Sequence, residues 1–426
     1  MSHPYASHLI VILFFSCQLL FAQENQSSKW AKILENYQIK ASAGLQFMGT
    51  YTLNQKIYDP GTNRYEKVDN RWNLQMRRFR FNLTGQAYPN LTFKFTGAID
   101  LVGRDVLSAT VGGANNGRAP NFGLWNAYLQ WRLLTQNEGL FLTFGYLSPQ
   151  ISRASLNCAM RATSFEKSWV QNYMRRTLVG TGPGRAPGIN LGGQLTPSNT
   201  FAVSYDFGLF NPVNNGPSPN TQGLSASPLL TARLVFHFGD PETKNYSLSH
   251  RTNYFGQRNG LSFALAASHR GASDLFDRSQ TIGADFLLNL GHFNLDGEWN
   301  YLIRESQENT SQANVGYFRF SYSIPLEQQA HLEPVFMYVR LNGALDRVGQ
   351  ESAKILGAFA GSNEILDWTI NYYFNPNFKL AFSFTKNIGN LGEAAPGSLL
   401  NNHYAQNGIG AIERGDLIGL GMTLIL

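Results

Sequence analysis

The run FNLDGEWNYLIR, at Phe293–Arg304, decides the fold of this chain. Alternate positions carry Phe, Leu, Gly, Trp, Tyr and Ile, whereas the positions between them carry Asn, Asp, Glu, Asn, Leu and Arg. A β-strand places successive side chains on opposite faces, so this pattern indicates a strand with one apolar face and one wet face.

Other segments repeat the same alternation. It recurs in LTFKFTGAIDL at Leu91–Leu101 and in FKLAFSFTK at Phe378–Lys386. In Arg77–Gln86 the polar face is rich in Arg, and the apolar phase changes just before it. An extra residue in one strand produces such a change, so we expect a β-bulge near Met76-Arg77.

Sixteen segments of this kind follow one another without helical patterns between them. They run to about ten residues, the length that a tilted strand needs to cross a bilayer. The sequence therefore predicts an all-β fold, a transmembrane antiparallel up-and-down β-barrel of sixteen strands in residues 37–426. The predicted strands begin near Tyr37, Asn73, Leu91, Phe122, Gly139, Gly188, Thr200, Pro228, Leu261, Thr281, His292, Ala313, His331, Glu364, Phe378 and Asp416.

The N-terminus carries an export signal in our interpretation. Residues 1–22 contain an apolar run that ends at Ala22, and residues 23–36 form a short periplasmic segment with a helix expected at Ser27–Asn36. After residue 22 no apolar run approaches the ~18 residues of a transmembrane helix. We therefore expect export by the signal peptide to the outer membrane of a Gram-negative cell. Cys158 then has no partner for a disulfide bond.

The predicted connections alternate between tight turns and long loops. Turns such as Asn375-Pro376-Asn377 are expected on the periplasmic side, and long loops outside the cell or folded into the pore. The long connections are Val102–Asn121, Ser148–Pro187, Asn211–Ser227, Gly239–Gly260 and Gly389–Gly415.

The loop Ser148–Pro187 carries six basic residues and one acid, Glu166. Folded inward, it would make a positive pore constriction, because low-dielectric walls focus such a field on anions. The alternative is that its cations bind lipopolysaccharide phosphates or the loop's own carbonyls at the rim. A short helix is expected at Ala162–Thr177. The six candidate constriction residues are Arg153, Arg161, Lys167, Arg175, Arg176 and Arg185.

Charges on the strands are expected to face the lumen, since a charge facing lipid at mid-bilayer costs about 2–4 kcal/mol. Most should form salt bridges with the five acids expected on the same face, and the positive excess should influence selectivity. The predicted lumen-facing basic residues are Arg78, Arg80, Lys94, Arg132, Arg233, Arg304, Arg319, Arg340 and Lys379.

Signals for other functions are weak. There is no G-x-S-x-G, H-E-x-x-H or P-loop motif, so no enzyme activity, cofactor or metal site is predicted. His269, His292 and His331 are the histidines that could meet in a lumen. The net charge of +6 suits anionic solutes, and no basic helix or stacked-aromatic motif indicates nucleic acid.

Several runs resemble the phosphate-selective porin O and P family. They are QMRRFRFNLTG at Gln75–Gly85, WNAYLQW at Trp125–Trp131, LTFGYLSPQISRA at Leu142–Ala154, the Arg-Gly-Pro-rich return within Phe165–Leu195, and AVSYDFGLFN at Ala202–Asn211. The resemblance implies a trimeric sixteen-stranded barrel with an inward loop and a basic channel. The family's basic stretch is replaced by Tyr146-Leu147-Ser148-Pro149, so phosphate selectivity is not carried over.

The sequence thus predicts an outer-membrane porin for passive diffusion of small hydrophilic solutes, with a weak preference for anions and phosphate as one candidate. The alternative is a non-conducting structural, adhesive or secretion-associated barrel. The expected partners are the solutes, outer-membrane lipid and lipopolysaccharide, and the barrel-assembly machinery, which reads apolar last strands such as Asp416–Leu426. A homotrimer is implied by the resemblance.

Overall fold

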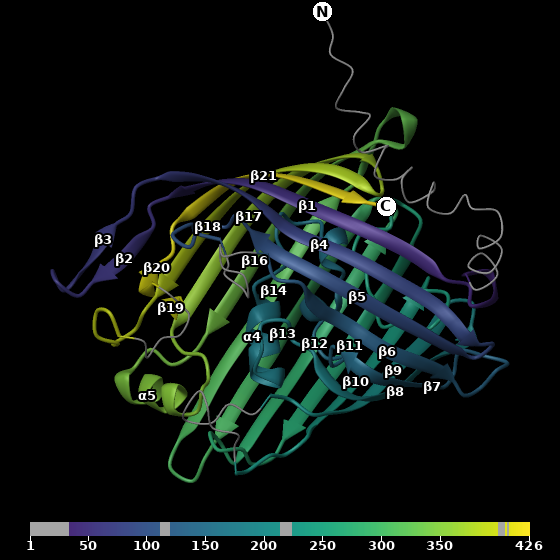
Figure 1. Cartoon of the computed structure of the whole chain (residues 1–426), viewed down its shortest axis with the longest axis horizontal. Coiled ribbons are helices and arrows are strands. Elements are labelled where there is room, and N and C mark those ends of the chain that lie inside the picture. Colours follow the sequence, from purple (N-terminus) through teal and green to yellow (C-terminus); the bar gives the residue numbers. More distant parts are fainter. Residues whose placement is uncertain (1–33, 111–119, 214–223, 399–404, 407–408) are drawn as a thin grey trace, which may run out of the picture.

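Sixteen long antiparallel strands form a closed β-barrel in the computed structural model, which describes residues 34–110, 120–213, 224–398, 405–406 and 409–426 (Figure 1). Each barrel strand pairs with the next along the chain, and the first pairs with the last to close the barrel. The strands are β1 (Lys40–Leu53), β4 (Arg71–Tyr88), β5 (Leu91–Val102), β6 (Gly123–Arg132), β7 (Phe141–Leu147), β8 (Ala186–Ser198), β9 (Phe201–Phe210), β10 (Leu229–Gly239), β11 (Asn259–Arg270), β12 (Arg278–Leu290), β13 (Phe293–Glu305), β14 (Thr310–Tyr322), β16 (His331–Asn342), β17 (Ser362–Asn375), β18 (Phe378–Asn390) and β21 (Asp416–Ile425).

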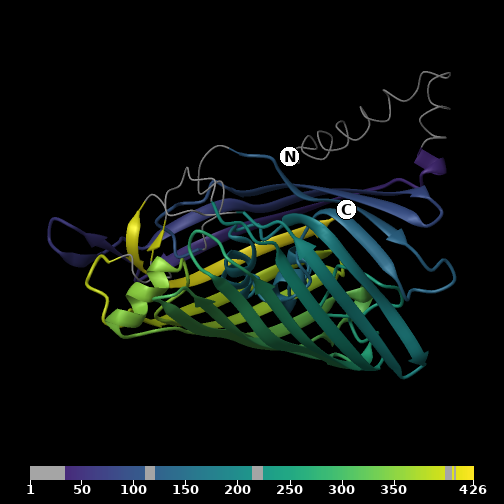
Figure 2. The ribbon, with the colours of Figure 1, turned by 90° about the horizontal axis from the view of Figure 1, so that it is seen from below.

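The remaining elements lie in the connections. A small four-stranded sheet and one helix project from the same end of the barrel (Figure 2). Among the described residues, no helix is long and apolar enough to cross a membrane. The additional elements are β2 (Lys56–Asp59), β3 (Arg64–Lys67), β15 (Ile324–Pro325), β19 (Ala405–Gln406), β20 (Gly410–Glu413), α3 (Arg153–Leu156), η1 (Ala159–Arg161), α4 (Val170–Val179), η2 (Glu327–Gln329) and α5 (Arg347–Ile355).

The two ends of the barrel differ. We call the end with the start of β1, the end of β21 and tight connections such as residues 376–377 the turn end. The opposite end, which carries α5 and the small sheet, is the loop end. The predicted Asn375-Pro376-Asn377 turn lies at the turn end, together with the tight connections at residues 89–90 and 291–292.

The sequence pattern located the strands well. Every predicted start lies within three residues of an observed one, the largest offsets being those of Tyr37 against Lys40, Thr281 against Arg278 and Ala313 against Thr310. The predicted β-bulge is also confirmed. In the pairing of β1 with β4, Gln46 faces Arg78 and Phe47 faces Met76, which leaves Arg77 as the extra residue.

Two expectations about the connections are corrected. Residues 240–258 fold into the barrel, one of the two places expected for the long connections, but they enter from the turn end rather than the loop end, because they join β10 to β11 there. The helix expected at Ala162–Thr177 begins later, at Val170. Residues 162–169 before it are not helical, and the wall holds them by hydrogen bonds: Phe165 N donates to Thr369, and Thr163 O accepts from Asn371.

The N-terminal predictions concern residues that are mostly outside the described ranges. Export by a signal peptide at residues 1–22 therefore stays a prediction. Of the helix expected at Ser27–Asn36, residues 34–36 are described and are helical.

The segment Ser148–Pro187, which we call the crossing segment, folds into the barrel because it carries its own apolar face. On α4, Val170, Met174 and Leu178 are buried against the wall. Their partners include Val339 and Leu341 of β16, whose inward residues from Val335 to Leu341 are apolar rather than polar. Burial of each such side chain contributes about 1.5–3 kcal/mol. Gly180 ends α4 with φ 81°, a backbone conformation that favours glycine.

We predict that Met174→Ala weakens the docking of α4 by about 2–5 kcal/mol, because it leaves a cavity at a fully buried site. Trypsin should then cleave the detergent-solubilised barrel faster at Arg175 or Arg176. Leu380→Ala, on the exposed outer face of β18, is the control and should leave the cleavage rate unchanged. Equal rates in the two variants would show that α4 is not held by this packing.

Candidate functional site

The interior of the barrel is the candidate site, and the crossing segment organises it. At its first anchor, Arg153 is 1% exposed and lies between two carboxylates. Its Nη2 is 2.7 Å from Oε1 of Glu242, and its Nε is 2.8 Å from Oδ1 of Asp285. Arg233 pairs with the other oxygen of Asp285 at 2.9 Å. This network ties the crossing segment both to β12 and to the in-folded residues 240–258.

The second anchor is Glu166, which the β-bulge makes possible. The bulge turns two consecutive residues, Arg77 and Arg78, toward the lumen, and both guanidinium groups pair with the Glu166 carboxylate. The Arg78 Nη2 lies 2.6 Å from Oε2. Burial alone raises the pKa of the Glu166 carboxyl, but the two arginines reverse that effect and hold the pKa at about 2.

A second bulge brings an indole into the lumen. In the pairing of β5 with β6, Thr96 faces Asn126 and Gly97 faces Leu124, so Trp125 is the extra residue. The guanidinium carbons of Arg80 and Arg185 lie 4.3 Å and 4.0 Å from the centre of its ring. Cations at such distances are attracted to the aromatic face.

We call this group the Trp125 cluster; it comprises Trp125, Arg77, Arg78, Arg80, Arg175, Arg185, Glu166 and Asp100. Five arginines meet two carboxylates, so the cluster carries a net charge of +3. Burial, with repulsion from Arg78 and Arg80, lowers the pKa of the Arg175 guanidinium to about 9, so that it remains charged at neutral pH. Among the described residues, its Nε has no hydrogen-bond partner.

Besides Arg153, three of the six predicted constriction residues lie outside the Trp125 cluster: Lys167, Arg161 and Arg176. Lys167 donates to the carbonyls of Ser155 and Asn157, at 3.1 and 2.7 Å, so its charge serves the segment's own backbone. Arg161 lies at the turn end, where it donates to the 376–377 turn. Arg176 is exposed toward the loop end. The role of all six as anion-attracting residues stays a prediction.

The structure places most of the predicted wall cations on the inner face, where they have protein partners. Arg319 pairs with Asp296 at 2.8 Å, and Arg132 pairs with Glu138 at 3.3 Å. Arg304 donates to Thr177 O and Gly357 O, and Lys379 to Ala162 O. The remaining residues of this set on the inner phase of their strands are Arg78, Arg80, Lys94 and Arg233.

Arg340 is a correction, because it lies on the outer face. Its neighbours Val339 and Leu341 are buried against the crossing segment, so the alternation of β16 turns Arg340 outward. There it lies 3.7 Å from Glu364, close to the loop end of β17. A strand with apolar residues on both faces gives no sequence signal for which face is inside.

Sequence reasoning missed three contributors to the interior. Arg77 was not counted inward, although the predicted bulge beside it allowed that placement. Trp125 lies on the strand predicted to begin near Phe122, but the bulge that turns it inward has no clear sequence pattern. Glu242 lies in a loop that was not expected to enter from the turn end, so no pattern linked it to Arg153.

The three histidines His269, His292 and His331 do not converge on one site. The rings of His292 and His331 lie 6.3 Å apart, whereas His269 is exposed on β11. Within the described ranges, no group of three or more His, Cys, Asp or Glu residues is placed to hold a metal ion.

A closed sixteen-stranded barrel with a segment folded into its lumen is the architecture of an outer-membrane porin. The chain belongs to the phosphate-selective porin O and P family, whose sequence profile matches residues 50–408. The resemblance predicted from the sequence is thereby confirmed. No curated protein matches the chain.

Solved porin structures share the fold at low sequence identity. The outer membrane channel DcaP of Acinetobacter baumannii is 11% identical with a TM-score of 0.52, covering 91% of this chain and 97% of its own. OprB of Pseudomonas putida at high pH is 10% identical with a TM-score of 0.56, covering 94% and 97%. The anion-selective porin from Comamonas acidovorans is 11% identical with a TM-score of 0.51, covering 91% and 99%. These likenesses show the fold alone.

We predict that acid releases the Glu166 anchor. Because the pKa of Glu166 is about 2 in the folded protein and 4.5 for an ordinary Glu, the stabilisation is complete above pH 4.5 and is lost as the pH falls toward 2. Single-channel recordings should become noisier over that window. Glu166→Gln should show the noise at neutral pH, and an identical pH profile in this variant and the wild type would contradict the assignment.

Proposed function

We propose that this protein is a passive porin with a preference for small anions. The charge imbalance of the Trp125 cluster carries this proposal. Five guanidinium groups are gathered around one indole inside the barrel, and two carboxylates neutralise them only in part. Uncompensated buried charge is costly, so mobile anions are the natural counterions of this cluster.

The geometry supports a simple mechanism. The cluster lies between the wall strands β4 and β6 and the crossing segment, where protein on several sides keeps the local dielectric constant low. The positive field there raises the local concentration of anions and lowers that of cations. The buried Nε of Arg175 has no hydrogen-bond partner among the described residues, so the protein leaves part of the donor capacity of this guanidinium group unused. Phosphate is one candidate among small anions.

A non-conducting barrel is the second candidate, and one observation favours it. Both the crossing segment and residues 240–258 occupy the interior, and Val170, Met174 and Leu178 of α4 are buried against its wall. A structural, adhesive or secretion-associated role would suit such a filled barrel. The absence of any conductance step from purified protein in a planar bilayer would favour this candidate.

The assembly and partners are also proposals. A homotrimer follows from the family resemblance alone. Lipid contact is supported by exposed aromatic and aliphatic side chains on the outer phase of the strands, such as Trp368, Ile370 and Phe382. Contacts with lipopolysaccharide and the barrel-assembly machinery remain expectations from the class of protein.

We predict that the wild-type pore shows an anion-selective reversal potential in a salt gradient across a planar bilayer. The double variant Arg175→Gln/Arg185→Gln removes two of the five cluster cations and should shift that potential toward cation selectivity. Arg64→Gln, an exposed charge change on the β3 strand outside the barrel sheet, is the matched control. Cation selectivity in the wild type would refute the proposed anion preference.

A further inference from the structure

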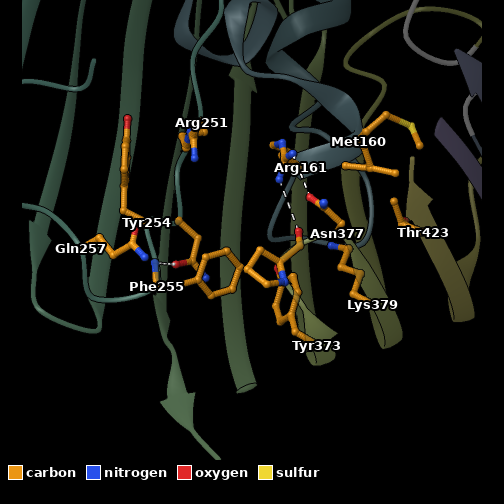
Figure 3. A pocket seen from close by; sticks show the side chains of 13 residues that line it. Met160, Arg161, Arg251, Tyr254, Phe255, Gln257, Tyr373, Asn377, Lys379 and Thr423 are labelled. Atoms are coloured by element: carbon orange, nitrogen blue, oxygen red, sulfur yellow. Dashed lines mark hydrogen bonds between the residues drawn. The ribbon is translucent and has the colours of Figure 1, made fainter. Parts of the chain in front are cut away.

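A pocket at the turn end combines positive charge with aromatic rings (Figure 3). It lies between the crossing segment, the in-folded residues 240–258 and strands β17 and β18. None of its lining residues is Asp or Glu. The residues that determine its chemistry are Arg161, Arg251, Lys379, Tyr254, Phe255 and Tyr373.

Phe255 is held in this pocket at a conformational cost. Its φ is 52°, in the left-handed region that bulky side chains rarely adopt. A hydrogen bond of 2.7 Å from its N–H to Oδ1 of Asn253 fixes the turn. Its ring packs edge to face against the ring of Tyr373, and the two ring centres lie 5.1 Å apart. Figure 3 shows the two side chains next to each other. Strained residues of this kind are concentrated at ligand sites.

A second pocket, at the loop end, also combines basic side chains with aromatic rings. Arg176, Arg270 and Arg304 line it together with Phe276 and Phe359, again without an acidic residue. The guanidinium carbons of Arg304 and Arg270 lie 4.8 and 5.5 Å from the centre of the Phe276 ring. A solute that enters at either end of the barrel therefore meets the same pair of features, cations and aromatic rings.

We propose that the solute of this barrel is an organic anion with a flat apolar body, such as an aromatic carboxylate. This inference rests on the proposed porin function and specifies its solute class. The carboxylate would pair with guanidinium groups, and the ring would pack against Phe255 and Tyr373 at one end and Phe276 and Phe359 at the other. An inorganic anion would use the cations but not the rings, whose contact with it would cost hydration.

The test compares binding and conductance for three probes at equal ionic strength: benzoate, acetate and inorganic phosphate. Calorimetry on the full-length barrel in detergent measures binding, and planar bilayers measure block of the chloride current. We expect benzoate to bind and block at lower concentrations than acetate or phosphate. Arg251→Gln and Arg176→Gln, both exposed side chains, should each weaken benzoate binding about tenfold, which is the loss of one charge-assisted hydrogen bond. Arg64→Gln should leave it unchanged.

Each outcome decides between the two claims. Preferential binding of benzoate with no conductance by any ion supports the solute class and refutes the porin function. Conductance with equal block by benzoate and acetate, or stronger block by phosphate, supports the porin function and overturns the solute class. Phe255→Leu keeps an apolar side chain without the aromatic ring. If it binds benzoate as tightly as the wild type, the contribution of the ring is refuted.

Discussion

The ion pairing of Arg153 with Glu242 and Asp285 is the interaction on which the interior depends. It joins three parts of the chain that approach from different directions: the crossing segment, the residues folded in from the turn end, and the barrel wall. All three side chains are almost fully buried. Removing one partner of a buried pair leaves an uncompensated charge and typically costs 3–5 kcal/mol, roughly the range of a large core truncation. The network therefore fixes where the crossing segment and residues 240–258 lie inside the lumen, and so how the lumen is divided between them.

The distribution of charge in the lumen follows from this division. From β10 to β14, wall arginines pair with inward-facing wall carboxylates in two places, Arg233 with Asp285 and Arg319 with Asp296. The positive excess is instead gathered on the opposite side, around Trp125, where two β-bulges each add a side chain to the inner face. Small irregularities in β4 and β6, the strands on either side of β5, thus concentrate a field that regular strands would spread along the wall.

The sequence predicted the barrel closely and the interior only in part. Strand positions follow from alternation, which is strong wherever one face meets lipid and the other water. The prediction failed at β16, because Val339 and Leu341 face a protein core inside the barrel, so that both faces are apolar and Arg340 was assigned to the wrong side. It also failed for residues 240–258, since contacts such as that of Glu242 with Arg153 join positions 89 residues apart, and no local pattern encodes them.

The crossing segment also constrains the order in which the molecule can be completed. It follows β7, early in the chain, yet it contacts wall residues that come much later, as in the hydrogen bond from Lys379 to Ala162 across 217 positions. Contacts of such long range form slowly, because the chain must close large loops before they are made. The crossing segment cannot take up its final position until β17 and β18 are in place. Filling of the lumen is therefore a late step of assembly. A barrel that has only just closed would have a wider open lumen than the mature protein.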